Sequence, residues 1–268
     1  MVDASDKSKQ AAAGAGEGAP ATVTACLIVI GNEILSGRTK DKNLGFVAER
    51  LTDWGIRLTE ARVIPDVEAT IVETLNACRA RFDYVFTTGG IGPTHDDITA
   101  AAVAKAFGVA LHRHPEALKI MQRQHKPEDL NEARLKMADV PEGSVLIDNP
   151  VSGAPGFRIG NVHVMAGVPM IMQAMLEGLR HTLVGGAPVR SRAVRAFLPE
   201  GAVAEGLGVI QARHPELDIG SYPFYRKGRF GTNLVLRGTD EAVLAQAEGE
   251  VGDLIRALGG TPAEDLDD

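Results

Sequence analysis

The chain has 268 residues, of which 44% are hydrophobic but only 4% aromatic, and its formal net charge is −7. This length suffices for one sizeable domain, or for a main domain with a smaller one, around a core of mostly aliphatic side chains. The negative charge, with an isoelectric point near 5.6, argues against broad binding to nucleic acids or anionic membranes. No apolar run approaches the roughly 18 residues that cross a membrane, so we expect neither nucleic acid nor membrane as a partner.

Residues 1–21 are rich in alanine and glycine, which predicts a disordered tail. From residue 22 to residue 187, strand-like and helix-like segments then alternate. Strands are predicted over 24–31, 57–64 and 83–88, and helices over 43–56, 67–82 and 96–109. Asp96 and Asp97 would thus lie in the first turn of the third helix, where the helix dipole favours carboxylates. The alternation is typical of a doubly wound α/β domain with a mostly parallel sheet.

The second half of the chain is less uniform. Residues 126–156 contain several prolines and glycines and follow no regular pattern, but a strand and turn over 161–169 lead into a helix over 170–183. Residues 188–260 follow a βαββα pattern, which predicts a small α+β domain. Residues 261–268 are expected to form a short acidic tail.

Two cysteines, Cys26 and Cys78, lie in apolar segments and belong to no CxxC pair. They are interpreted as small buried hydrophobic side chains. Together with the lack of a secretory signal, this usage predicts a reducing, cytoplasmic location. Because neither cysteine has a nucleophile setting and no Gly-x-Ser-x-Gly elbow is present, covalent catalysis is disfavoured.

The segment TTGGIGPTHDDIT at 87–99 leaves the end of a predicted strand, where ligands bind in open α/β sheets. Its glycines allow backbone N–H groups to approach a phosphate, and the expected ligand-binding residues are Thr88, Gly89, Gly90, Gly92 and Thr94. The carboxylates of Asp96 and Asp97 would repel that phosphate unless a divalent metal lies between them. We therefore predict a metal held by this pair, which also serves catalysis, the alternative being an N-capping pair without a ligand.

The segment GNEILSGRTKDKN at 31–43 follows the first predicted strand and could line the same crevice. Its expected ligand-binding residues are Gly31, Asn32, Glu33, Ser36, Gly37 and Asn43, and Asp41 is a candidate catalytic residue. The alternative is a solvated loop in which Asp41 caps the next helix.

Two further loops and one patch are weaker candidates. Ser152 and Gly153 lie in NPVSGAPGFRIG, and Gly167 and Pro169 lie in AGVP; each loop could close the crevice or be ordinary turn structure. The aromatic and basic segment GSYPFYRKGRF at 220–230 could stack a base, or form an exposed hairpin.

Four segments in this order, IGNEILSGRTKDKN, TTGGIGPTHDDIT, SGAPGF and AGVP, resemble the molybdopterin-binding (MoCF biosynthesis) domain family. The similarity is greatest to the competence/damage-inducible protein A (CinA-like) branch, in a short form without its amidase domain. It covers about residues 22–185, and IGSYP and LVLRG resemble the middle domain of that branch. The resemblance implies a three-layer α/β fold whose substrate lies where 89–92, Asp96 and Asp97 meet the loop at 31–43. One departure is that AGVPMIM lacks the acidic residue usual in the family.

Relatives in cofactor biosynthesis bind molybdopterin, and some adenylylate it with Mg²⁺. Relatives in the CinA-like branch are associated with metal-dependent hydrolysis of nucleotide pyrophosphates such as ADP-ribose or FAD. The resemblance thus implies a hydrolase acting on such anhydrides with Mg²⁺, Mn²⁺ or Co²⁺, in a homo-oligomer. The alternatives are molybdopterin binding or adenylylation, and a binding module that has lost its chemistry.

Overall fold

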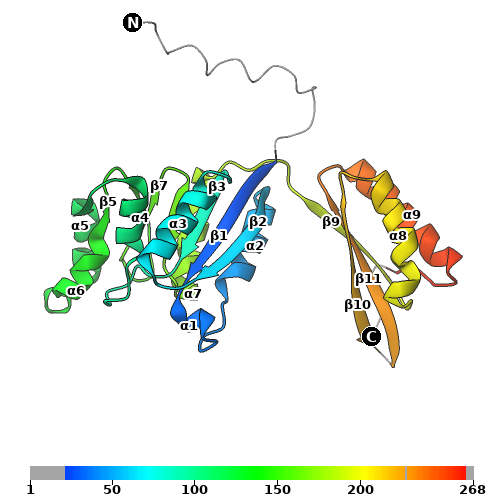
Figure 1. Ribbon diagram of the computed structural model, residues 1–268, viewed down its shortest axis with the longest axis horizontal. Helices are drawn as coiled ribbons and strands as arrows, with labels where there is room; N and C mark the ends of the chain where they lie inside the picture. Colours follow the sequence, from blue (N-terminus) through cyan, green and yellow to red (C-terminus); the bar gives the residue numbers. More distant parts are fainter. Residues whose placement is uncertain (1–21, 227, 264–268) are drawn as a thin grey trace, which may run out of the picture. The chain divides into compact units, whose positions relative to one another are not determined.

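The computed structural model describes residues 22–226 and 228–263, and the chain divides between Ala187 and Pro188 into two compact units (Figure 1). The tail expected at 1–21 lies outside the described residues. Of the acidic tail expected at 261–268, only 261–263 are described, and Ala263 pairs with Arg195.

The N-terminal unit is built on a six-stranded sheet of order β2-β1-β3-β8-β7-β6. The first four of these strands run parallel, and β7 and β6 are antiparallel to their neighbours. The elements up to the third strand are β1 (Val23–Ile30), α1 (Asn32–Leu35), α2 (Asn43–Asp53), β2 (Ile56–Ile64), α3 (Glu68–Arg79) and β3 (Tyr84–Thr88). They are followed by α4 (Thr99–Phe107), β4 (Leu111–Arg113), α5 (Pro115–Gln124), η1 (Pro127–Asp129), α6 (Glu132–Leu135), η2 (Lys136–Ala138), β5 (Asp139–Pro141), β6 (Val145–Ile147), β7 (Gly156–Ile159), β8 (Val162–Met165), α7 (Pro169–Leu179) and η3 (Arg180–Thr182).

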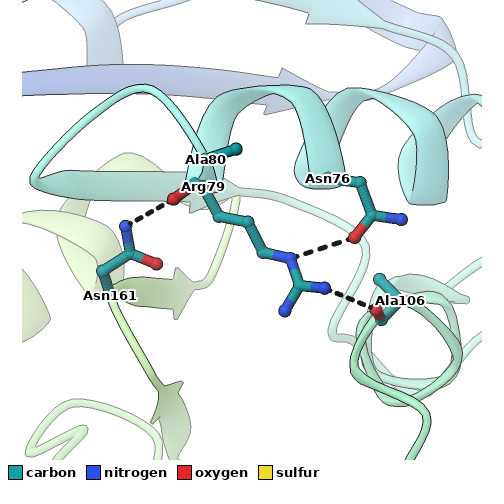
Figure 2. Close-up of a pocket in the computed structure, with 5 residues that line it drawn as sticks. All are labelled: Asn76, Arg79, Ala80, Ala106 and Asn161. Atoms are coloured by element: carbon teal, nitrogen blue, oxygen red, sulfur yellow. Dashed lines mark hydrogen bonds between the residues drawn. The ribbon is translucent and has the colours of Figure 1, made fainter. Parts of the chain in front are cut away.

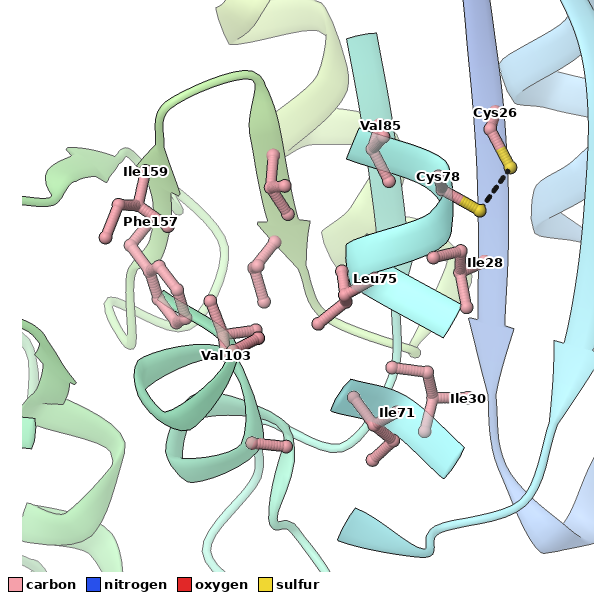
Figure 3. Close-up of a cluster of buried hydrophobic side chains, with 14 of the residues drawn as sticks. Cys26, Ile28, Ile30, Ile71, Leu75, Cys78, Val85, Val103, Phe157 and Ile159 are labelled. Atoms are coloured by element: carbon pink, nitrogen blue, oxygen red, sulfur yellow. Dashed lines mark hydrogen bonds between the residues drawn. The ribbon is translucent and has the colours of Figure 1, made fainter. Parts of the chain in front are cut away.

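Helices cover both faces of this sheet, which confirms the three-layer, mostly parallel α/β prediction. On one face α3 and α4 pack against the inward side chains of β1, β3 and β8, and on the other α2 and α7 do so. Cys26 of β1 and Cys78 of α3 are fully buried in the first core, with their sulfur atoms 3.5 Å apart (Figure 3). The interpretation of both cysteines as buried hydrophobic side chains is confirmed, and burial raises the pKa of the Cys26 thiol to about 12.

The order in which strands are added to the sheet reverses between the neighbouring strands β1 and β3. The strand that follows β1 in the chain, β2, pairs on the far side of β1, whereas the later strands of this sheet all lie on the far side of β3. Such a reversal marks the carboxyl ends of β1 and β3 as the place where ligands bind in doubly wound sheets.

Several elements differ from the prediction. Helix α4 begins at Thr99 and has no acidic residue in its first turn, so Asp96 and Asp97 lie in the preceding turn and the helix-dipole argument for them was wrong. The region 126–156, for which no element was predicted, contains α6, β5 and β6. These elements have three or four residues each, too few for a period to be recognised in the sequence.

The C-terminal unit is an antiparallel sheet of order β10-β11-β9 with two helices. Its elements are β9 (Arg190–Ala196), α8 (Glu200–Arg213), β10 (Asp218–Arg226), β11 (Arg229–Gly238) and α9 (Glu241–Ala257). The predicted α+β class is confirmed, and the hairpin β10–β11 is longer than expected. Within the described part of the chain, every helix is too short or too polar to cross a bilayer.

Candidate functional site at the carboxyl ends of the strands

Three loops meet at Gly89, directly after β3. Its φ is 104°, and a Cβ atom added there would overlap the carbonyl oxygen of Ile30 at the end of β1. A Cβ at Gly167 would lie 3.2 Å from the Cα of Gly89, and the Asn43 side chain donates to the Gly167 carbonyl at 2.9 Å. Gly89, Gly167 and Asn43, one from each of the three predicted loops, are thus brought together, because glycine lets the backbones approach.

Thr99, the first residue of α4, holds the glycine loop by two hydrogen bonds. Its hydroxyl donates to the Gly89 carbonyl at 3.1 Å, and its N–H donates to the Gly90 carbonyl at 3.0 Å. In contrast, the N–H groups of Gly90, Ile91 and Gly92 donate no hydrogen bond within the described residues. Three consecutive amides without acceptors on a rigidly held loop are suited to an anion such as phosphate.

The two carboxylates of the motif meet at one hydroxyl group. Thr94 Oγ1 lies 2.5 Å from Asp96 Oδ1 and 2.5 Å from Asp97 Oδ2, and the Thr94 N–H donates to Asp97 Oδ2 at 2.8 Å. A hydroxyl carries one proton, so only one of the two short contacts is a hydrogen bond at a time. The Thr94 hydrogen bond is the main cause that lowers the pKa of Asp96 below its ordinary value. Asp97 Oδ2 lies beside Gly92, where an added Cβ would be 2.6 Å from it.

Lys136 fixes the turn that presents this pair. Its ammonium group donates to the carbonyl oxygens of Thr94 and Asp97, at 2.9 and 2.8 Å. The positive charge lies behind the carboxylates and is bonded to the backbone, so it orders the turn without forming an ion pair with Asp96 or Asp97.

In the loop 31–43, several polar groups serve the loop itself. Asp41 Oδ1 accepts from the Leu44 N–H at 2.8 Å and so caps α2, which is the alternative role considered for this residue. The Asn32 N–H donates to Asp66 Oδ2 at 2.8 Å, and the Ser36 hydroxyl donates to the Glu33 carbonyl at 3.2 Å. The Glu33 carboxylate lies over Gly31, and Gly37 has a φ of 71°.

Two buried polar atoms of the crevice residues have no partner within the described residues. They are Asn43 Oδ1, at the start of α2, and Thr88 Oγ1, at the end of β3. Both residues are at most 4% exposed. A buried acceptor or hydroxyl without a partner costs about 1–3 kcal/mol, so these two residues lower the stability of the fold at this end of the sheet.

The loop 149–156 is organised by Asn149, a buried residue. The Asn149 side chain donates to the Ser152 hydroxyl and to the Ala154 carbonyl, both at 2.7 Å, and accepts from the Ser152 N–H. Gly153 has a φ of 74°, and Gln124 fills the space where its Cβ would lie. Pro155 of this loop and Gly90–Gly92 of the glycine loop line a cavity of about 20 Å³, which is room for one water molecule. The hydroxyl and the N–H of Ser152 are thus used within their own loop, whereas its carbonyl accepts from His125 Nε2 at 2.9 Å. Pro169 forms the first residue of α7.

The donor set at the mouth of the crevice fits a hard divalent cation. Asp96 and Asp97 each place a carboxylate oxygen 2.5 Å from the Thr94 hydroxyl, and carboxylate oxygens are ligands that Mg²⁺ and Mn²⁺ prefer. Among the residues that the structure describes, the three-residue group with metal-ligand spacing is Cys26, Glu60 and Cys78. That group is a poorer candidate, because the raised pKa of Cys26 keeps a ligand atom protonated.

A hollow of about 580 Å³ lies at the opposite end of the sheet, lined by Asn76, Arg79 and Asn161 (Figure 2). Arg79 donates to Asn76 Oδ1 and to the Ala106 carbonyl, both at 3.0 Å, and lies over the Phe107 ring. Asn161 donates to the carbonyls of Arg79 and Phe82. These groups partner one another and join α3 to α4 and β8, so we assign the hollow a structural role.

Three residues that position the site were not among the predicted site residues. Thr99 and Lys136 hold the motif loop, and Asp66 holds the loop after β1. Asp66 follows the predicted strand 57–64, so the strand-end rule could have indicated it. Lys136 lies in a region without a predicted element, and its sequence carries no such signal.

The family model described as probable molybdopterin binding domain matches residues 26–184, and that described as FAD synthase, middle domain, matches residues 188–258. A protein of Pyrobaculum calidifontis is 37% identical over 212 residues, which cover 75% of this chain and 80% of the relative. A CinA-like protein of Citrifermentans bemidjiense is 34% identical over 267 residues, which cover 90% of this chain but 61% of the relative. The crystal structure of CinA from Thermoplasma acidophilum, a protein of unknown function, is 34% identical with a TM-score of 0.57, and the match covers 60% of this chain and 98% of that one.

Proposed function

Because the chain belongs to the CinA-like branch of the molybdopterin-binding domain family, we propose that it is a divalent-metal-dependent hydrolase of nucleotide pyrophosphates. Its substrates are of the ADP-ribose or FAD type, and its active site is the crevice at Gly89. The match of the C-terminal unit to the FAD synthase middle domain supports a nucleotide rather than a pterin as the substrate.

The observation that carries this proposal is the position of two carboxylates in the turn that follows three amides without acceptors. An anion cradle at Gly90–Gly92 and a paired negative charge at Asp96 and Asp97 oppose each other unless a cation joins them.

In this proposal the reaction joins a water oxygen to one phosphorus atom and breaks the bond from that phosphorus to the bridging oxygen. ADP-ribose then gives AMP and ribose 5-phosphate. When bound, the cation supplies positive charge that offsets Asp96 and Asp97 and polarises the anhydride. The glycine-loop amides hold the phosphate oxygens, and Thr94 and Lys136 keep the carboxylates in position.

Release of AMP from ADP-ribose in the presence of Mn²⁺ tests the proposal. We expect Asp97→Asn to lower turnover on the order of 100-fold, as does the loss of one electrostatic group from an active site. The melting temperature should stay within about 4 °C of the wild type, because Asp97 lies in a partly exposed turn.

The matched control is Arg79→Gln, which changes a hydrogen-bonded residue at the other end of the same sheet. Its turnover should remain close to that of the wild type. Unchanged turnover in Asp97→Asn would contradict the assignment of Asp97 to the active site. ATP-dependent adenylylation of molybdopterin, without AMP release from ADP-ribose, would assign the crevice to cofactor assembly instead.

A further inference from the structure

The strand β2 forms one edge of the six-stranded sheet (Figure 1). It has nine residues and pairs with β1 on its inner side, and within the described part of the chain no strand pairs with its outer side. The N–H and C=O groups on that outer side therefore lack ladder partners. A long edge of this kind is a surface on which a strand of another chain can pair.

The other edges of the two larger sheets are protected against such pairing. At the far edge of the same sheet, β6 has only three residues. In the C-terminal sheet, the edge strand β9 pairs with Ala263 through Arg195, and the edge strand β10 contains Pro223, which has no N–H to donate. Short, covered and proline-containing edges all resist pairing with another chain. The strand β2 is long, uncovered and free of proline.

The outward hydrogen-bonding groups of β2 can be assigned from its last residue. A bulge at Thr59 shifts the register with β1, and the residues after it pair regularly. The Ile64 carbonyl accepts from the Gly31 N–H at 3.1 Å, on the side of β1. Because the N–H and C=O groups of successive residues in a strand point to opposite sides, those of Ala61 and Val63 point away from β1. Both residues are exposed, Val63 by 42%.

Two opposite charges flank Ala61 along the strand. Arg62 Nε donates to Glu60 Oε1 at 2.5 Å, and Arg81 Nη1 lies 3.3 Å from Glu60 Oε2. The side chains of Glu60 and Arg62 are 28% and 31% exposed. An edge with charges of a single sign would repel a copy of itself, because like charges directly opposite each other destabilise a strand pair. This edge carries both signs.

The order of these charges is complementary to itself in one register. When two β2 strands pair antiparallel about an axis at Ala61, the outward groups of the two Ala61 residues bond to each other. Glu60 of each copy then lies opposite Arg62 of the other copy, at positions where side chains across the pair are closest. With the axis at Arg62, the two Arg62 side chains would lie opposite each other. The charges therefore favour the register centred on Ala61.

From the unprotected edge, its outward N–H and C=O groups and its self-complementary charges, we propose that β2 is the surface through which two copies of this chain associate. The two strands pair antiparallel about Ala61, and the two six-stranded sheets become one continuous sheet. Hydrogen bonds of the backbone supply affinity, and Glu60 and Arg62 select the register. This association does not depend on the hydrolysis proposed for the crevice.

Sedimentation analysis of the full chain from about 1 to 100 µM tests the proposal, and we expect a reversible monomer–dimer equilibrium. Ala61→Pro removes the outward N–H but no hydrogen bond to β1, so the fold should persist. The dissociation constant should rise at least about tenfold, because the central hydrogen bonds are lost. The matched control is Ala61→Val, which keeps the N–H and should dimerise as the wild type does.

Exchange of the two charges tests the register. Glu60→Arg and Arg62→Glu each place like charges opposite each other in the dimer, so each should raise the dissociation constant about tenfold. The double variant restores opposite charges and should return the dissociation constant to within about threefold of the wild-type value. Single variants that dimerise as the wild type does would contradict this register.

Cross-linking provides a second measurement should Ala61→Pro fail to fold. Ala61→Cys places two thiols across the axis with Cα atoms about 5.5 Å apart, within the range of a disulfide. Oxidation by glutathione disulfide should join them and release two molecules of glutathione. Ala245→Cys, at an exposed alanine of α9, is the control and should remain uncrosslinked.

Three results would overturn the proposal. They are a monomer throughout the concentration range, a dimer that folded Ala61→Pro leaves unchanged, and an Ala61→Cys variant that does not cross-link. A monomer whose Ala61 amide exchanges slowly with solvent would place a segment of the same chain on this edge instead.

Discussion

The two ends of the N-terminal sheet differ in whether their polar groups have hydrogen-bond partners. At the amino ends of β3 and β8, Asn76, Arg79 and Asn161 line a hollow of about 580 Å³ and hydrogen-bond to one another and to backbone carbonyls. At the carboxyl ends, Asn43 Oδ1, Thr88 Oγ1 and the amides of Gly90–Gly92 have no partner within the described residues.

This difference teaches that polar groups without hydrogen-bond partners are a better guide to a ligand site than the size of a hollow. A satisfied network stabilises the fold and gains little from a ligand. An unpartnered group costs about 1–3 kcal/mol when buried, and a ligand that bonds to it offsets that cost. The unpartnered polar groups therefore lower the stability of the fold at the carboxyl ends of the strands, which is where the proposed chemistry occurs.

The largest effect that sharpens the comparison is expected for Gly89→Ala. The φ of 104° disfavours a side chain, and the new Cβ would overlap the Ile30 carbonyl. We expect the free energy of unfolding in urea to fall by about 4 kcal/mol, from backbone strain and overpacking together. The control is Gly37→Ala in the neighbouring loop, where φ is 71° but no atom lies within 4 Å of the new Cβ. Its expected loss is about 1 kcal/mol, and equal losses at both positions would contradict the close approach at Gly89.

A smaller change in the free energy of unfolding is expected when the pH is lowered and His163 becomes protonated. Its Nδ1 is also unpartnered, but it lies in the core and not at the carboxyl ends of the strands. Burial lowers its pKa from 6.5 to about 4, with a further contribution from Arg158. Between these values the unfolded chain binds a proton that the folded chain does not bind. The contribution of His163 to the unfolding free energy should therefore be nearly constant above about pH 7 and fall by about 3 kcal/mol as the pH drops to 4.

The His163 effect is measured by urea unfolding at several pH values. His163→Phe keeps an aromatic ring against Phe86, which His163 stacks on at 5.1 Å, but cannot titrate. The pH dependence of this variant should be smaller by the contribution of His163. An identical pH dependence in both proteins would show that the neutral core histidine is not its source.

The sequence predicted the architecture well where elements were long and their apolar pattern was regular. The strand at 24–31 is a continuous apolar run, and it corresponds to β1, buried on both faces. Prediction was poorer for β6 and β7, with three and four residues. Their place in the sheet depends on the pairing of β7 with β8 and of β6 with β7, contacts that no local pattern encodes.

For the candidate site, glycine and carboxylate spacing was sufficient to identify the loops but not the roles of individual side chains. Asp41 was considered both a catalytic residue and a cap, and the structure records the capping hydrogen bond to Leu44. The start of α4 was placed three residues too early, because the turn at Thr94–Asp97 resembles a helical first turn in sequence. Lys136 lies about forty residues from the turn that it holds, so only the tertiary structure identifies it.

The central claim is that a divalent cation reconciles the glycine loop with Asp96 and Asp97. The most direct measurement is the affinity of the chain for ADP-ribose, by calorimetry at low temperature, with Mg²⁺ and with EDTA. We predict that removing Mg²⁺ weakens binding by at least about tenfold, since the carboxylates then repel the pyrophosphate. Equal affinity in Mg²⁺ and in EDTA would contradict the account.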